Sequence, residues 1–441
     1  MTEVLRIGCG AGLANDRFDA AVELTENGNL DVLVLECLAE RTIALGQTRE
    51  LAEPGTGYDP TLERRIRSLL GPLAAHGTQL VTNLGSANPI AAGELVARVA
   101  TDMGVAVRIA VLTGDDVFAR IDQSAPAWED GKPLDTHGPL VSANAYLGVE
   151  QLLPAVQTGA DIIITGRVAD PSLFLAPLVH RFGWALDDWE HLARGTAVGH
   201  LLECGSHLTG GYFADPPYKQ VPNLAYVGFP LAEVRADGQT VVTKNAGTGG
   251  LVTVGTVAEQ MTYEVLDPSR YLTPDVTADF HDISLAQVGL DRVSVSAAVG
   301  TERPDQLKVS VGYRAGYRCE AEISYAGEGS VARARLASDV VRTRLAGIAD
   351  RMRIDLFGMN ALHGDVLSAA GDPYECRLRM SAVCETADQA HAAGEEVVGL
   401  YNNGPAGGGG ARSHTTELIG VVSTDIRRTA VHTNVTMLET R

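Results

Sequence analysis

The first 210 residues alternate between short apolar runs and longer amphipathic stretches. The apolar runs are rich in β-branched residues, as in strands that are buried on both faces of a sheet. We expect strands at Val4–Gly8, Asp31–Glu36, Gln79–Asn83, Val105–Leu112 and Asp161–Thr165. Helical patterns follow after Pro60, from Ile90 to about Met103, and over Ala143–Thr158. This alternation predicts βαβ units, and therefore an α/β domain with a doubly wound parallel sheet.

The strongest candidate for chemistry is the junction after the last of these strands. There Thr165 and Gly166 lead to Arg167 and Asp170, and Pro171 suits the first turn of a helix. Right-handed crossovers bring the carboxyl ends of parallel strands to one edge, where open α/β sheets bind ligands. An arginine at this edge can bind a substrate carboxylate, and an aspartate can move a proton. Alternatively, the two side chains only pair with each other.

The same edge should collect the ends of the other strands. These contribute Glu36, Asn83, Asn88 and the loop that begins at Gly8. Asparagine amides can hold a carbonyl or carboxylate group, but they equally stabilise turns through their own backbone. The polar segment Asp115–Pro139 is expected to cover one side of the site as a loop.

The pattern changes after about residue 210. Glycines and prolines mark a loop-rich connector over residues 211–285, and an α+β second domain is expected over residues 286–441. Its strands are expected at Arg292–Ala298, Gln306–Arg314, Tyr317–Tyr325, Tyr374–Glu385, Leu418–Ser423 and Ile426–Val435, with a turn at Gly312–Gly316 and helices at Ser330–Met352 and Ala387–Leu400. The expected domains are thus 1–210, 211–285 and 286–441.

Composition narrows the choice of partners and compartment. The chain has 441 residues, of which 45% are hydrophobic, and a formal net charge of -20. Such a charge disfavours nucleic acid and anionic membranes as partners. Six cysteines without a CxxC pair indicate a reducing compartment and no disulfide or zinc ribbon. No signal peptide precedes the first strand and no apolar run approaches the ~20 residues of a membrane span, so we expect a cytoplasmic protein.

The loop Gly8-Cys9-Gly10-Ala11-Gly12 lies where a phosphate-binding loop would lie, and Asp16 and Arg17 follow it. Its GxGxG spacing departs from the dinucleotide pattern GxGxxG. Three interpretations stay open: dinucleotide binding, a turn that lines a ligand, and a purely structural turn. Cys9 near a helix N-terminus is either a nucleophile or, as for most single cysteines, inert packing.

One cluster has metal-like composition. His200, Glu203 and His207 share one helix face if the helix continues through Gly205, and Cys204 is adjacent. The glycine and the lack of a complete spacing signature count against a metal, and we predict none. The alternatives are a catalytic Glu203 or His200, and a helix cap or core pair.

A glycine run at residues 404–410 follows Asn402 and Asn403 and precedes Arg412. It suits either an anion-binding nest closed by Arg412 or a mobile connector. We favour binding, because four consecutive glycines in an ordered region are costly in backbone entropy.

Several motifs in one order resemble the acyclic terpene utilisation (AtuA-like) family over nearly the whole chain. They are Ile7–Gly12 with Asp16-Arg17, Thr165–Asp170, Gly199–Gly205, Gly228-Phe229-Pro230, Gly247–Gly250 and Asp267-Pro268 with Tyr271. The resemblance implies a cytoplasmic metabolic enzyme that handles acyl-CoA or related carboxylates. Longer members carry a small C-terminal ferredoxin-like domain, so a separate ferredoxin-like partner subunit is implied for this chain.

We therefore expect a homo-oligomeric enzyme that acts on a small or CoA-linked carboxylic acid by hydration, elimination or proton abstraction. In this hypothesis Arg167 binds the carboxylate or polarises a carbonyl, and Asp170, Glu203 or His200 transfers the proton. The Gly8 loop, Asn83 and Thr165 line the substrate, coenzyme A enters only as part of it, and no cofactor is bound. The alternatives are a nicotinamide-dependent oxidoreductase and a non-catalytic subunit that needs a partner.

Overall fold

The chain forms two compact units in the computed structural model, which describes residues 4–296, 298–349, 351–368 and 371–440. The first unit comprises the chain up to Leu134, Val141–Gly312 and the segment from Val421 onward. The second comprises Asp135–Leu140 and Tyr313–Gly420. The division differs from the expected boundaries at residues 210 and 285, because the chain leaves the first unit and later returns to it.

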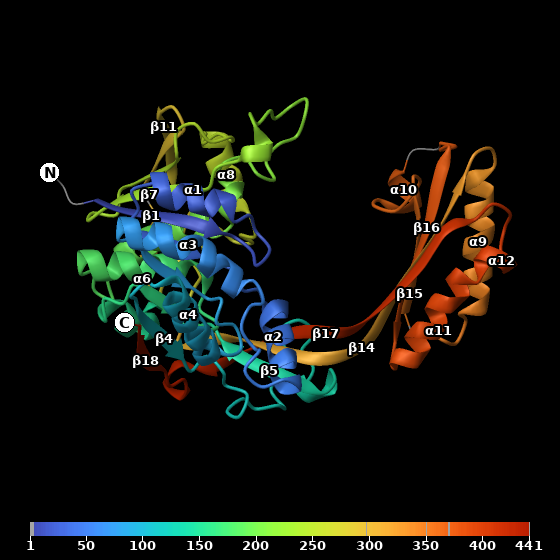
Figure 1. Cartoon of the computed structure of the whole chain (residues 1–441), viewed down its shortest axis with the longest axis horizontal. Helices are drawn as coiled ribbons and strands as arrows, with labels where there is room; N and C mark the ends of the chain where they lie inside the picture. Colours follow the sequence, from blue (N-terminus) through green and yellow to red (C-terminus); the bar gives the residue numbers. More distant parts are fainter. Residues whose placement is uncertain (1–3, 297, 350, 369–370, 441) are drawn as a thin grey trace. The chain divides into compact units, whose positions relative to one another are not determined.

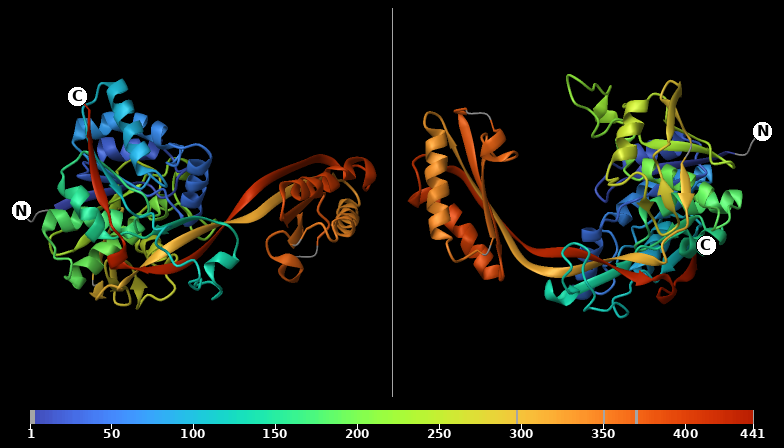
Figure 2. Two further views of the ribbon diagram at one scale, coloured as in Figure 1. Left: turned by 90° about the horizontal axis from the view of Figure 1, so that it is seen from below. Right: turned by 180° about the vertical axis from the view of Figure 1, so that it is seen from behind.

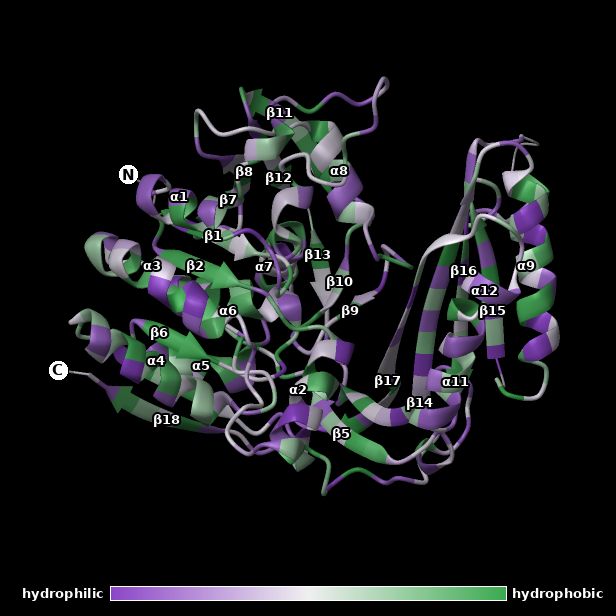
Figure 3. Cartoon of the chain, turned by 45° about the vertical axis from the view of Figure 1, so that its right-hand side comes forward, coloured by the Kyte–Doolittle hydropathy of each residue, from purple (hydrophilic) through white to green (hydrophobic). Residues whose placement is uncertain are grey.

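The first unit is built on five parallel strands. Their order in the sheet is β1 (Val4–Ala11), β2 (Val32–Leu35), β3 (Gln79–Thr82), β6 (Ile162–Ile164) and β4 (Arg108–Thr113). The strands β2 and β6 are apolar at every position, which Figure 3 shows as continuous green. Such strands need cover on both faces, and helices supply it.

The crossover helices lie on opposite faces according to the direction of the connection. The connections from β1 through β2 and β3 to β4 run one way, and their helices α1 (Asp19–Asn27), α3 (Leu62–His76) and α4 (Pro89–Met103) pack together over one hydrophobic core (Figure 1). The connection from β4 back to β6 runs the other way through α5 (Val149–Gln157). It packs on α6 (Asp170–Phe182), which in turn packs on α7 (Trp189–Leu202), outside that core. Right-handed crossovers produce this two-faced arrangement.

Antiparallel strands extend the parallel centre on both sides. Beside β1 lie β7 (Pro230–Arg235), β8 (Thr240–Lys244), β12 (Arg292–Ser296) and β11 (Ser284–Gly289), and beside β4 lies β18 (Asn434–Glu439). The described sheet is therefore mixed and has ten strands. The doubly wound parallel prediction holds for its centre only, and part of the expected connector forms strands.

The second unit is an α+β layer. Its strands β14 (Gln306–Ala326), β15 (Arg351–Phe357), β16 (Glu375–Cys384) and β17 (Gly409–Arg427) are ordered β15-β16-β14-β17. Buried residues alternate along β16, and α9 (Ser330–Arg344) and α11 (Ala387–Val398) pack on that buried face. The strands β14 and β17 run on from one unit into the other, as both views of Figure 2 show.

Several local predictions are wrong. The strand β14 is continuous over 21 residues, so there is no turn at Gly312–Gly316. The segment Leu140–Ala145 is a strand, β5, which pairs with β14, although a helix was expected from Ala143. The first helix of the second unit ends at Arg344 rather than Met352. The strand β1 continues to Ala11, so most of the expected glycine loop is strand.

The remaining elements complete the description. They are α2 (Glu40–Ala52), α8 (Val254–Thr262), β9 (Tyr271–Leu272), β10 (Thr277–Asp279), β13 (Val299–Thr301), α10 (Gly364–Leu367) and α12 (Leu400–Asn403). The helix α2 was not predicted. Among the described residues, no helix is both long and apolar enough to cross a membrane.

Candidate functional site

The junction between β6 and α6 holds a buried arginine. Arg167 is 1% exposed, and its backbone N–H donates to Asp115 Oδ2 at 2.9 Å. Its guanidinium donates to the backbone carbonyl of Leu38 and forms an ion pair with Asp170. The Arg167 Cζ also lies 4.3 Å from the centre of the Tyr146 ring. Arg167 therefore does not project into a crevice as expected; protein groups already surround its guanidinium.

Asp170 is the member of this pair that reaches solvent. It is the first residue of α6, and its side chain is 37% exposed. Desolvation raises the pKa of Asp170, and the opposing charge of Arg167 does not fully offset that rise. Its place at a helix N-terminus, beside a guanidinium, holds the carboxylate in one position.

A second carboxyl group lies behind the pair, at the end of β2. Glu36 Oε1 accepts from Asn83 Nδ2 and from the Leu38 N–H, each at 2.9 Å. Asn83 in turn accepts the Cys37 N–H at 2.8 Å. Burial, together with the nearby charge of Asp170, raises the pKa of Glu36 well above its usual value. The charged Arg167 therefore pairs with Asp170, whereas Glu36 is the carboxyl group that tends to stay protonated.

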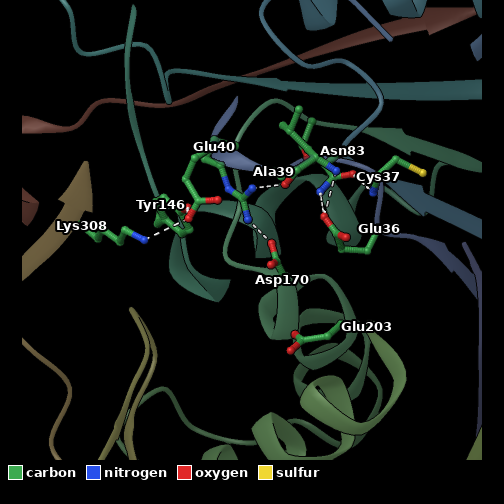
Figure 4. Close-up of polar contacts among 12 residues, drawn as sticks. Glu36, Cys37, Ala39, Glu40, Asn83, Tyr146, Asp170, Glu203 and Lys308 are labelled. Atoms are coloured by element: carbon green, nitrogen blue, oxygen red, sulfur yellow. Dashed lines mark hydrogen bonds and ion pairs between the residues drawn. The ribbon is translucent and has the colours of Figure 1, made fainter. Parts of the chain in front are cut away.

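A third carboxyl group, Glu40, connects Tyr146 to a lysine. Glu40 Oε1 accepts the Tyr146 hydroxyl at 2.5 Å and lies 3.1 Å from Lys308 Nζ (Figure 4). Burial opposes ionisation of Glu40, but the Tyr146 hydrogen bond and the Lys308 charge outweigh it and lower the pKa to about 2. Lys308 Nζ also lies 4.7 Å from the centre of the Tyr146 ring.

Of these side chains, Tyr146, Asp170 and Lys308 line one cleft of about 370 Å³ in the first unit, whereas Glu36, Glu40 and Arg167 do not line it. The other walls of the cleft carry aromatic and proline side chains. Those walls include Trp128, Pro171, Tyr271, Pro274 and Pro304. A cavity of this size, mostly apolar with a few fixed charges, has the usual character of a small-molecule site.

The predicted histidine cluster divides into two parts. His200 is 1% exposed, and its Nδ1 lies 2.9 Å from Glu203 Oε1. His207 stacks instead on Tyr212, with a centroid distance of 5.1 Å. Among the described residues, no group of three or more His, Cys, Asp and Glu side chains is arranged to hold a metal ion.

The glycine segment near β1 is filled by protein. Added Cβ atoms would meet Leu30 at Gly8, Leu35 at Gly10 and the Cys204 backbone at Gly12, all within 2.8 Å. The Gly12 N–H, which a phosphate would need, donates to Asp16 Oδ2 at 3.0 Å. These glycines serve close packing, and the geometry does not fit a dinucleotide phosphate.

The neighbours of this segment are also engaged within the protein. Cys9 is 0% exposed and burial raises its pKa well above the usual value, which does not suit a nucleophile. Arg17 pairs with Asp19 and donates to the Ala225 carbonyl at 2.6 Å.

Other predicted site residues have local structural contacts. Asn88 caps α4 by accepting the Ala91 N–H at 3.0 Å, and Thr165 is buried and donates to the Gly166 carbonyl. The remaining three predicted site residues, Asn402, Asn403 and Arg412, belong to the second unit. The Asn403 side chain donates to the Gly399 carbonyl, and Arg412 pairs with Glu322.

Three residues of the cluster were not predicted. Glu40 begins an unpredicted helix, Tyr146 follows a strand mistaken for a helix, and Lys308 comes from β14. Asp115 was placed only in a covering loop, yet it is 4% exposed and also accepts from Asn144 Nδ2 at 2.9 Å. The position of Asp115 directly after β4, like that of Glu36 after β2, is a signal that could have identified it.

Fold and cluster together define a mixed α/β protein with a charged cleft at the carboxyl edge of its sheet. The comparisons with known proteins specify the class further. The family model described as acyclic terpene utilisation family protein AtuA matches residues 5–437, and the chain belongs to this family. No curated protein and no solved structure gave a significant match.

Proposed function

We propose that the protein is a metabolic enzyme that binds a small carboxylic acid or the acyl end of a CoA thioester in the cleft. Asp170 acts there as the acid/base group of a reaction that is a hydration, an elimination or a proton abstraction next to the carbonyl. The proposal rests on one observation: a carboxylate that lines the cleft is fixed from behind by a fully buried arginine.

The other cleft residues support this chemistry. Lys308 supplies a positive charge that can hold a carboxylate, or the oxygen of a thioester as negative charge develops on it. Desolvation raises the pKa of Asp170 above its ordinary value, which is the direction that suits a general base. Arg167 takes a positioning role in this proposal, and the carboxylate-binding role expected of it passes to Lys308.

Trp128 lines the cleft and offers a direct binding assay. Butyryl-CoA, butyrate and free coenzyme A should be titrated against tryptophan fluorescence, with Trp128→Phe as the control. We expect butyryl-CoA or butyrate to change the Trp128 signal, and Lys308→Met to weaken that response at least tenfold. A response that persists in Trp128→Phe, or none to either acyl compound, would contradict the proposal.

Chemistry is tested by deuterium exchange at the α-carbon of butyryl-CoA in D₂O, followed by NMR. The assay is run with and without a co-expressed small ferredoxin-like protein. The Asp170→Asn variant should bind the thioester but lose exchange by about 10²–10⁴-fold. Exchange that survives this substitution would remove Asp170 from the mechanism.

A further inference from the structure

A second acid/base pair is buried directly behind the cleft, on α7. His200 and Glu203 bind each other at 2.9 Å, and their side chains are only 2% and 12% exposed. His200 packs on Tyr271, which lines the cleft, with a ring-centroid distance of 5.2 Å. The pair is thus separated from the substrate space by cleft-lining residues, without being part of the lining itself.

Close helix packing brings the end of α7 against the turn that carries Asp170. Gly199 precedes His200, and a Cβ at Gly199 would lie 2.6 Å from the Cα and carbonyl oxygen of Pro171. Pro171 follows Asp170 in the first turn of α6. The missing side chain therefore lets α7 touch the turn that carries Asp170, and Figure 4 shows Glu203 beside that turn.

One member of the pair has an atom that is free to exchange a proton. Glu203 Oε2 is buried and has no hydrogen-bond partner among the described residues, whereas the His200 ring also lies beside the backbone of Gln260 and Met261. A buried polar atom without a partner is costly, and native proteins retain few of them. Such an atom behind a cleft is expected where a group must change its protonation state.

The electrostatics agree with this geometry. Burial, and to a smaller extent the charge of Asp170, raise the pKa of Glu203 to about 7, although His200 opposes the rise. Burial alone would lower the pKa of His200, but the hydrogen bond with Glu203 leaves it raised. The other titratable groups near Glu203 are Cys204, Tyr271 and Glu264.

We propose that the His200–Glu203 pair is a proton reservoir that exchanges a proton with Asp170, an inference that rests on the proposed function of Asp170. The substrate α-C–H bond breaks, its electron pair remains on the thioester as an enolate, and the proton forms an O–H bond on Asp170. That proton then moves to the free oxygen of Glu203, which leaves Asp170 ionised. Reprotonation follows the same path in reverse.

The coupling is tested in the intact chain by ¹³C NMR of labelled carboxyl groups, independently of any substrate. A signal that titrates near pH 7 and disappears in Glu203→Gln identifies Glu203. In Asp170→Asn its midpoint should fall by about one pH unit, because the nearby negative charge is gone. In Glu264→Gln, which removes an exposed carboxylate with a smaller effect on Glu203, it should fall by less than in Asp170→Asn. His200→Gln should raise the midpoint.

Two results would overturn the proposal: a Glu203 midpoint at its ordinary acidic value, or one that neither Asp170→Asn nor His200→Gln moves. Deuterium exchange into butyryl-CoA then separates this inference from the function on which it rests. Glu203→Gln should slow exchange tenfold or more and flatten its pH profile near neutrality, while Glu264→Gln should not. If Asp170→Asn abolishes exchange and Glu203→Gln leaves both rate and profile unchanged, the reservoir is wrong. If Asp170→Asn has no effect, the proposed function fails first.

Discussion

The guanidinium of Arg167 is shared between the Asp170 carboxylate in the cleft and the Leu38 carbonyl beneath it. A lysine in its place keeps the charge but cannot make both contacts with fixed geometry. Arg167→Lys should therefore lower the free energy of unfolding by about 1.5–3 kcal/mol, the usual worth of a hydrogen bond to a charged group. Urea unfolding measures this loss.

Asp170→Asn is the matched variant, because that side chain is partly exposed and its main proposed role is chemical. We expect a small change in urea midpoint together with a large loss of deuterium exchange. If both variants unfold much more easily while each folded molecule keeps its activity, the pair is structural and the catalytic assignment is wrong.

Asp115 gives the first unit a defined pH dependence. Burial raises the pKa of Asp115 from 3.8 to about 6. The folded protein therefore binds a proton more tightly than the unfolded chain, and the ionised Asp115 costs stability as pH rises from about 4 to 6. Asp115→Asn removes this cost, so relative to the parent it should gain about 1–3 kcal/mol between pH 4 and pH 7.

Urea unfolding at several pH values checks this, with Glu94→Gln on the exposed side of α4 as the control. The difference between Asp115→Asn and the parent should rise with pH, whereas that of Glu94→Gln should stay flat. A constant difference for Asp115→Asn would show that Asp115 is ionised throughout.

At the level of single residues, sequence identified the groups that directly follow buried strands. Arg167, Asp170 and Glu36 were predictable because right-handed crossovers must bring them to one edge. Lys308 and Glu40 were not, since they meet across 268 positions of chain and depend on the path of β14. The glycines near Cys9 suggested a ligand-binding loop but serve close packing, because tight packing and phosphate binding both favour glycine.

At the level of elements, the packing of α7 on α6 depends on missing side chains at Gly195, against Leu175, and at Gly199, against Pro171. Gly199→Ala would force Pro171 and α7 apart, so we expect it to cost about 1–3 kcal/mol, as overpacking does. Gly71 in α3 provides the control, because a Cβ there meets nothing within 4 Å. Gly71→Ala should be neutral or stabilise the protein by up to about 1 kcal/mol.

Thermal melting compares the two glycine variants. Equal effects would mean that helix propensity, and not the contact with Pro171, determines the outcome. Because this contact also positions Glu203, Gly199→Ala should in addition change the Glu203 titration, whereas Gly71→Ala should not.

The apolar runs predicted the parallel centre of the sheet, because strands that are covered on both faces are apolar at nearly every position. The antiparallel strands β7 and β8 lie in the expected connector and were not predicted, since short strands next to glycine and proline resemble loops. The interior Gly312 and Gly316 suggested a turn. In the structure a Cβ at either would collide with a neighbour, Ser142 or the Cys384 carbonyl, so these glycines allow close strand contacts instead.

At the level of the whole molecule, the larger segment of the second unit, Tyr313–Gly420, is an insertion with adjacent ends. Tyr313 and Gly420 face each other on β14 and β17, where a Cβ at Gly420 would lie 2.3 Å from the Tyr313 ring. Replacing residues 313–420 by Asn-Gly, a favoured two-residue hairpin, should therefore leave the first unit folded. We expect cooperative unfolding and an unchanged Trp128 response to butyryl-CoA. Loss of that response in a folded product would show that ligand binding also requires the second unit.

The strand β18 has a consequence for synthesis of the chain. It pairs with β4, and a hydrogen bond between Thr113 and Asn434 spans 321 positions. At about 5–20 residues per second, a ribosome needs roughly 15–65 s to make the intervening segment. Throughout that time the nascent protein carries β4 as an open sheet edge, which invites pairing with other chains. Translation speed, and any chaperone that covers this edge, should therefore determine how much chain reaches the native state.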